Sequence, residues 1–201
     1  HQLIIPLEYV VGCYKDAGEE LYEAIFSDKM DSILFERVAW HAMNGALMLR
    51  QYYHVKILYD KLAEREVGAE MRKQYDHMYV EALLWEKKND EARKIVQQYI
   101  HDPIFNVARG CLCGATDGEE KAKEMMKPYA SEASFPRKYA LMPSFFFGRI
   151  GQSSRWNSMA FMLEKRMLLR QLALFYHCCG VAERMEHYQT MEQGEYIEDE
   201  A

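Results

Sequence analysis

The chain has 201 residues, of which 49% are hydrophobic and 28% are charged, and a chain of this kind folds as one or two globular domains. Aromatic residues make up 13%, including 14 tyrosines, and so many large side chains argue against a disordered protein. The formal net charge is −6, so the chain has no basic excess with which to grip a nucleic-acid backbone.

Acidic residues gather at the C-terminal end. Five of the last ten residues are acidic: Glu192, Glu195, Glu198, Asp199 and Glu200. The rest of the chain is nearly balanced, with 26 acidic and 25 basic residues. We therefore expect one domain over residues 1–192, followed by a solvated acidic tail over residues 193–201.

Neither a membrane span nor a signal peptide is predicted. Apolar runs such as residues 141–147 are far shorter than the roughly 20 residues that a spanning helix needs. The sequence begins at His1, which fits a processed or partial chain.

The chain has five cysteines, which is an odd number: Cys13, Cys111, Cys113, Cys178 and Cys179. The two members of each neighbouring pair lie too close together in sequence for easy internal bridging. A helical chain of this size does not need disulfides to fold. We expect reduced thiols, in the cytosol, the mitochondrial matrix or a plastid.

Pairs of amphipathic helices recur along the chain. In the clearest unit, Ala92, Ile95, Val96 and Tyr99 follow the i, i+3, i+4, i+7 spacing of one helix face. The first helices of six such units are expected at residues 7–15, 35–52, 75–88, 104–115, 139–150 and 167–177. The second helices are anchored at Leu21, Val55, Ala92, Ala122, Trp156 and Ala182, which are 34, 37, 30, 34 and 26 residues apart. This period is typical of helical repeat proteins.

Glycines and prolines fall between the predicted helices. Glycine tolerates the left-handed backbone conformation that ends helices, and it occupies four predicted turns: Gly18, Gly118, Gly151 and Gly180. Pro103 and Pro136 suit the first turn of a helix. Pro143 is expected to kink its helix or to move the helix start to Ser144. No segment shows the alternation of a strand. The sequence thus predicts an all-α chain, an α-solenoid of about five to six stacked helix-turn-helix repeats.

The repeat resembles the pentatricopeptide and tetratricopeptide families. The likeness is best over residues 12–26, GCYKDAGEELYEAIF, ending at Met30, with echoes at residues 87–92 and 180–185. The pentatricopeptide resemblance implies an organelle protein that binds single-stranded RNA, with a polar base-reading residue early in each first helix. The corresponding positions are Pro6 or Leu7, Trp40, His77, Val107, Leu141 and Met167. Only His77 can read a base edge by hydrogen bonding, which favours protein packing over RNA reading.

No residue pattern points to catalysis or to a metal. Cys111 and Cys113 are two residues apart, so a helix does not place both thiols on one face. We therefore do not expect these two cysteines to form a metal site with His177, Cys178 and Cys179. Glu19, Glu20, Glu119 and Glu120 begin second helices, where carboxylates complement the helix dipole. Gly110 to Gly118 lacks the ending of a phosphate-binding loop. We expect no enzyme activity, no cofactor and no small-molecule substrate.

The fifth unit holds the most unusual cluster. Phe145, Phe146 and Phe147 precede Arg149 and Arg155. Three consecutive phenylalanines cover most of a helix circumference, so they either pack inside the stack or anchor a partner protein. With His77, these are the candidate RNA or partner contacts.

The sequence favours a non-catalytic scaffold or accessory subunit of a mitochondrial assembly, such as a divergent mitoribosome or a related ribonucleoprotein. Its partners would be other protein subunits, with RNA as a further partner. The alternative is a single-stranded RNA-binding protein in organelle transcript maturation or editing. A small helical enzyme or a cytosolic tetratricopeptide-like adaptor is a third. The mitochondrial matrix is the expected location, and otherwise the cytoplasm or another reducing compartment.

Overall fold

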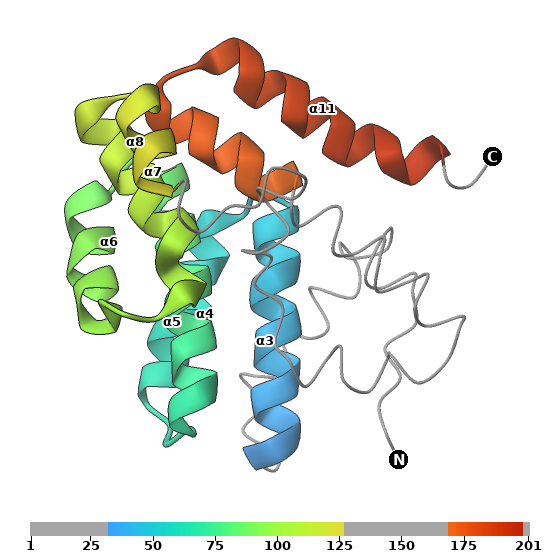
Figure 1. Ribbon diagram of the computed structural model, residues 1–201. Coiled ribbons are helices and arrows are strands. Elements are labelled where there is room, and N and C mark those ends of the chain that lie inside the picture. Colours follow the sequence, from blue (N-terminus) through green and yellow to red (C-terminus); the bar gives the residue numbers. More distant parts are fainter. Residues whose placement is uncertain (1–31, 127–168, 199–201) are drawn as a thin grey trace, which may run out of the picture. The chain divides into compact units, whose positions relative to one another are not determined.

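The computed structural model describes residues 32–126 and 169–198, and every regular element in these ranges is helical (Figure 1). The elements are α3 (Ser32–Met48), α4 (Tyr52–Ala63), α5 (Ala69–Trp85), α6 (Asn89–Val96), two 3-10 turns η1 (Gln97–Tyr99) and η2 (Pro103–Phe105), α7 (Asn106–Asp117), α8 (Glu119–Met126), a helix at 169–179, and α11 (Ala182–Glu198). The predicted all-helical chain is confirmed over these residues. Its stacking into a solenoid stays a prediction.

Two compact units divide the chain, His1–Glu86 and Lys87–Ala201. The boundary falls between α5 and α6, the two helices of the third predicted pair. Within the described ranges, no helix combines the length and the apolar content that crossing a membrane requires.

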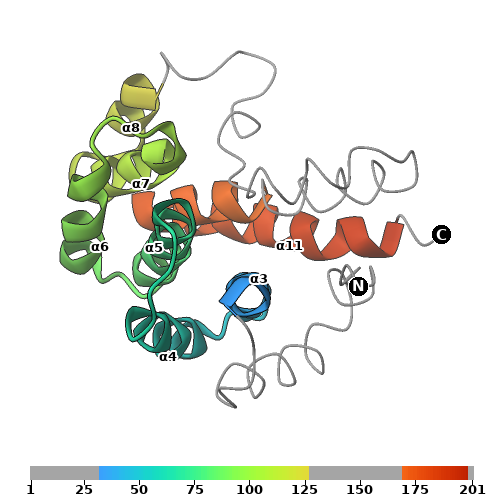
Figure 2. The ribbon, with the colours of Figure 1, turned by 90° about the horizontal axis from the view of Figure 1, so that it is seen from below.

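Unit 1 is built from three helices, and each of α3, α4 and α5 packs against the other two (Figure 2). The interior side of α4 is set by Val55, Leu58 and Leu62, which are all buried and lie three and four residues apart. Its opposite side carries Lys56 and Asp60, which are exposed. This is the amphipathic pattern expected from the sequence for the second helix of a pair.

The later parts of helices α3 and α5 are buried on all sides. Residues 38–47 of α3 and 74–84 of α5 are buried without interruption. Four of the buried α5 residues are polar: Gln74, Asp76, His77 and Glu81. Burying such groups is costly unless they are hydrogen-bonded, and the Tyr59 hydroxyl donates to the Asp76 carboxylate at 2.6 Å. The Tyr75 hydroxyl donates to the Glu36 carbonyl at 2.8 Å, which ties α5 to α3.

The turn between α3 and α4 differs from the sequence prediction. The first helix was expected to run to Tyr52, but α3 ends at Met48 and Tyr52 begins α4. The N–H of Arg50 bonds the Leu47 carbonyl at 3.1 Å, and the N–H of Gln51 bonds the Ala46 carbonyl at 2.8 Å. These two bonds form a Schellman motif, in which Arg50 takes φ 59°. This turn was not predicted, because arginine stands where glycine is usual. Helix α5 likewise begins at Ala69, six residues before the predicted start at Tyr75.

Unit 2 begins with α6, α7 and α8, in which α7 contacts both of the others. Two glycines of α7 let neighbours come close. A Cβ at Gly110 would collide with Met126 of α8, and a Cβ at Gly114 would collide with the Cys179 sulfur of the 169–179 helix. Gly110 and Gly114 therefore serve helix packing.

Two of the predicted glycine turns are confirmed. Gly118 has φ 93° between α7 and α8, and Gly180 has φ 76° before α11. The Gly180 N–H donates to the His177 carbonyl, and the Val181 N–H donates to the Tyr176 carbonyl. These two bonds form a second Schellman motif. Pro103 opens η2.

Several expectations lie outside the described residues. These are the first helix pair, the fifth pair, Gly18, Gly151, Pro136 and Pro143. Helix α11 continues to Glu198, so residues 193–198 of the expected acidic tail are helical.

Candidate protein-binding surface

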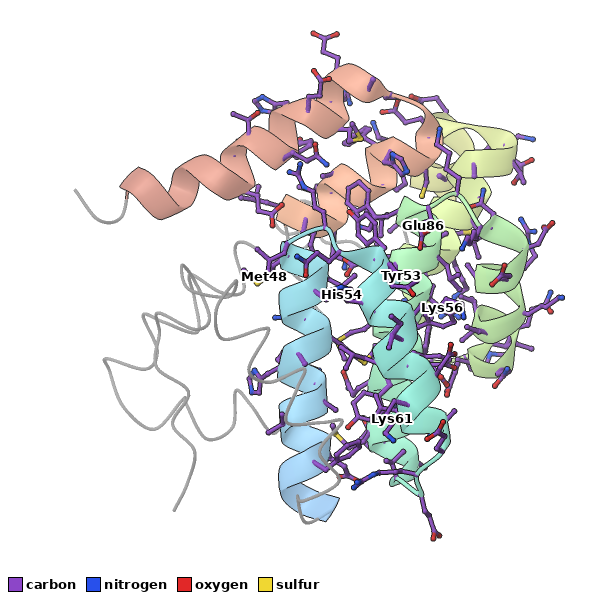
Figure 3. All side chains as sticks on the ribbon, turned by 180° about the vertical axis from the view of Figure 1, so that it is seen from behind. Met48, Tyr53, His54, Lys56, Lys61 and Glu86 are labelled. Atoms are coloured by element: carbon purple, nitrogen blue, oxygen red, sulfur yellow. The ribbon has the colours of Figure 1, made fainter. Side chains whose placement is uncertain are left out.

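The start of α4 carries the most exposed large apolar side chain among the described residues, next to the turn that leads from α3. Tyr53 is 70% exposed and Leu49, four residues before it, is 36% exposed. Tyr52, which precedes Tyr53 in sequence, and Trp85, on which Tyr52 stacks, are half-buried. We call Leu49, Arg50, Tyr52, Tyr53 and Trp85 the turn surface. Figure 3 shows Met48, Tyr53, His54 and Glu86 at this same end of the unit.

Tyr53 points outward because of the periodicity of α4. The buried positions of this helix are Val55, Leu58 and Leu62, and Tyr53 lies two residues before the first of them. Two residues along a helix correspond to a rotation of about 200°, so a side chain at position 53 faces away from the core. The exposed ring is thus a consequence of the helix register.

The backbone under the turn surface is fixed. Both Schellman hydrogen bonds hold Arg50 in the left-handed conformation, and the N–H of His54 bonds the Gln51 carbonyl at 3.0 Å. The rings of Tyr52 and Trp85 stack with centroids 6.1 Å apart and 12° between their planes, which joins the start of α4 to the end of α5. A rigid aromatic surface loses little conformational entropy when a partner binds.

The residue types of the turn surface are those that dominate protein–protein interfaces. Tryptophan, tyrosine and arginine are enriched among the side chains that carry most of the binding energy. The nearest ion pair on α4, Lys56 with Asp60 at 2.9 Å, has both side chains about half exposed, at 46% and 60%. Such pairs contribute little, so the aromatic rings are the stronger binding determinant.

Unit 2 displays a smaller apolar feature. Ile100 is 66% exposed on the loop after η1, next to the exposed side chains of Gln97, Gln98 and His101. Arg109 fixes this loop by donating hydrogen bonds to the carbonyls of Tyr99 and Asp102 and to the Asn106 side chain. A single aliphatic side chain among polar ones is common on protein surfaces, and Ile100 therefore ranks below the turn surface.

None of the candidate contacts expected from the sequence is among the residues that define the turn surface. His77 is only 6% exposed on α5, so an RNA base could reach its ring only if unit 1 opened. Phe145, Phe146, Phe147, Arg149 and Arg155 lie outside the described residues. Sequence reasoning missed Tyr53 because it placed Tyr52 at the end of a helix. Its exposure could have been predicted from the helix periodicity, because Tyr53 lies on the side of α4 opposite Val55, Leu58 and Leu62.

The four described cysteines of unit 2 carry thiols that are not joined in disulfides. Cys111 is buried, and Cys113, Cys178 and Cys179 are partly exposed. Burial raises the pKa of Cys179 to about 12, and burial with the nearby Asp117 carboxylate raises that of Cys113. Protonated thiols are poor nucleophiles and poor metal ligands. In the part of the chain that the structure describes, no three histidine, cysteine or acidic side chains are grouped so that they could hold a metal ion.

Comparison with known proteins gives one informative similarity. The chain is 25% identical over 213 aligned positions to a serine/threonine-protein kinase, PknD, of Protochlamydia amoebophila strain UWE25. The match covers 98% of this chain and 20% of the kinase, so the chain spans about one fifth of the length of that relative. No protein-family model matches the chain. No solved structure is significantly similar to it.

Proposed function

We propose that the chain is a non-catalytic helical-repeat module that binds a partner protein through the turn surface. The observation that carries this proposal is the 70% exposure of Tyr53 beside the stacked Tyr52 and Trp85 rings. An exposed aromatic residue on a fixed backbone suits a binding hot spot.

The burial of α3 and α5 supports a site on the outside of the repeats. In an open helical solenoid, the first helices of the pairs line the concave binding face. Residues 38–47 and 74–84 of the two corresponding helices are buried, so they offer no such face. The second helix α4 and its preceding turn carry the accessible side chains instead.

The kinase similarity supports an accessory module within a larger protein. The 201 residues contain none of the G-x-G-x-x-G, H-R-D or D-F-G motifs with which protein kinases bind and transfer phosphate. The matched fifth of the kinase therefore corresponds to a non-catalytic segment in our proposal. Such a segment would recruit substrates or regulators.

A binding experiment tests the proposal. The full chain, tagged and expressed in its own cells, is cross-linked and purified, and the partner recovered is titrated against the wild type and Tyr53→Ala. We expect Tyr53→Ala to weaken binding by about 30-fold or more, the effect of removing a hot-spot residue. Ile100→Ala is the matched control, because Ile100 is 66% exposed and lies in the other unit. Equal binding by wild type and Tyr53→Ala would contradict the proposed surface.

The organellar functions expected from the pentatricopeptide resemblance stay predictions. Recovery of mitochondrial ribonucleoprotein subunits with the wild type would support an accessory role in such an assembly. Binding of single-stranded RNA that falls steeply with salt would favour the RNA-binding alternative over the protein-binding module.

A further inference from the structure

Helix α11 is attached to unit 2 in a different way from its neighbours. Helices α7 and α8 bury apolar side chains such as Leu112, Ala122 and Met126. Over residues 182–192 of α11, by contrast, the only buried side chain is that of Glu192. Apolar burial, the main stabilising contribution in protein interiors, is therefore small for these three turns.

A polar and aromatic cluster attaches the first two turns of α11. One carboxylate oxygen of Glu119, on α8, accepts from Lys123 at 2.6 Å and from Arg184 of α11 at 3.2 Å. Arg184 also donates to the Tyr176 hydroxyl at 3.0 Å. We call Glu119, Lys123, Tyr176, Arg184 and Tyr188 the clasp.

Ring contacts complete the clasp. The guanidinium carbon of Arg184 lies 5.3 Å from the centre of the Tyr176 ring, within the range of a cation–π contact. On α11, the Tyr188 ring stacks on Tyr176 with centroids 5.6 Å apart and 9° between the planes. Tyr176 itself is buried, partly by these α11 side chains.

The connection to α11 is short and is built to turn. Only Gly180 and Val181 separate the 169–179 helix from α11. Gly180 has φ 76°, a conformation that glycine leaves and re-enters at little cost. A rotation at these two residues moves α11 and breaks the two hydrogen bonds that close the 169–179 helix, from the Gly180 N–H to the His177 carbonyl and from the Val181 N–H to the Tyr176 carbonyl.

We propose that α11 is a releasable strap, which the clasp holds on unit 2 and which opens about Gly180 and Val181 without unfolding the rest of the unit. Release uncovers the Tyr176 ring and removes Arg184 from Glu119, which keeps its ion pair with Lys123 within α8. The strap is sensitive to salt, because the Arg184 side chain is 54% exposed and its ion pair with Glu119 is accessible to solvent ions.

Hydrogen exchange of the full chain measures this opening directly. Exchange of α11 amides over residues 182–190 is compared with that of α7, in 50 mM and 500 mM NaCl. In Arg184→Ala we expect α11 to exchange about five times faster at low salt, the effect of losing about 1 kcal/mol from a surface network. High salt should accelerate the wild-type strap and have less effect on the variant.

Two variants sharpen the test. Arg93→Ala is the control, because Arg93 pairs with Asp90 at 2.8 Å within α6 alone and joins no separate elements. Tyr176→Phe keeps the ring and removes the hydroxyl, so it should loosen α11 less than Arg184→Ala. The proposal is overturned if α11 and α7 accelerate by the same factor in Arg184→Ala, since unit 2 then opens as a whole. It is also overturned if neither salt nor Arg184→Ala changes α11 exchange.

Discussion

At the scale of single residues, the described chain holds a histidine in the core of unit 1. His41 of α3 is only 6% exposed, and its ring meets Trp40 edge-on with centroids 4.9 Å apart. Burial disfavours the charged imidazolium and lowers the pKa of His41 to about 4. The folded chain therefore keeps this ring neutral at pH values at which the unfolded chain protonates it.

Unit 1 should lose stability on mild acidification. Because the folded pKa is depressed below the ordinary value of 6.5, the unfolded state binds more protons between these two values. The free energy of unfolding is highest above pH 6.5 and falls as the pH drops toward 4. From pH 7 to pH 5, His41 should account for a loss of about 2 kcal/mol. Urea unfolding at the two pH values measures it, and His41→Gln should show a smaller difference. An undiminished difference in the variant would assign the loss to other groups.

At the scale of elements, the end of α3 pairs a favourable hydrogen-bonding motif with an unfavourable residue. Arg50 adopts φ 59°, which costs an L-residue roughly 1–2 kcal/mol. Strained residues of this kind are frequent at functional sites, and Arg50 belongs to the turn surface. An arginine thus occupies a position at which the backbone conformation favours glycine.

Replacing Arg50 by glycine should stabilise unit 1. We expect Arg50→Gly to raise the free energy of unfolding by about 0.5–1 kcal/mol, because relief of strain exceeds the added entropy of the unfolded chain. Gln51→Gly is the matched control, since Gln51 has φ −95° and gains nothing from glycine. It should destabilise. Chemical denaturation compares the two variants. If both changed stability in the same direction, the left-handed conformation of Arg50 would not be the cause.

The sequence predicted the helices better than their ends. Periodicity found α4 and α6, because their apolar residues lie on one face. It found α5 only from Tyr75 onward, because the first residues of this helix are mostly polar and form no apolar face. The turn at Arg50 went unrecognised for lack of a glycine, whereas Gly118 and Gly180 marked their turns correctly. Tyr53 could not be identified as exposed without that boundary, since its outward direction depends on where α4 begins.

At the scale of the whole molecule, the chain consists of two compact units that meet in sequence at Glu86 and Lys87. The repeat pattern predicts one domain over residues 1–192, because its period continues across this point, and this stays a prediction. Periodicity reports local helix pairing. It carries no information on how strongly successive pairs adhere, which depends on side-chain packing.

The two units should respond separately to mutation. Gly114→Ala places a methyl group against the Cys179 sulfur, and overpacking of this kind costs about 1–3 kcal/mol. We expect faster hydrogen exchange in α7 of unit 2 and unchanged exchange in α4 of unit 1. Adding Cys179→Ala to the variant should restore much of the loss, because it removes the sulfur that collides. Equal acceleration in α4 and α7 would show that the chain opens as one cooperative unit.

The stacking of Tyr52 on Trp85 also makes the turn surface optically visible. An indole half-open to solvent changes its emission when water around it is displaced, and a tyrosine 6.1 Å away transfers excitation to it. A ligand that settles on Tyr53 would therefore alter the fluorescence of the unlabelled protein. Trp40 is 1% exposed and would supply a constant background, and Trp156→Phe would remove the emission of the third tryptophan of the chain. The molecule thus contains its own reporter for the partner that the turn surface is proposed to bind.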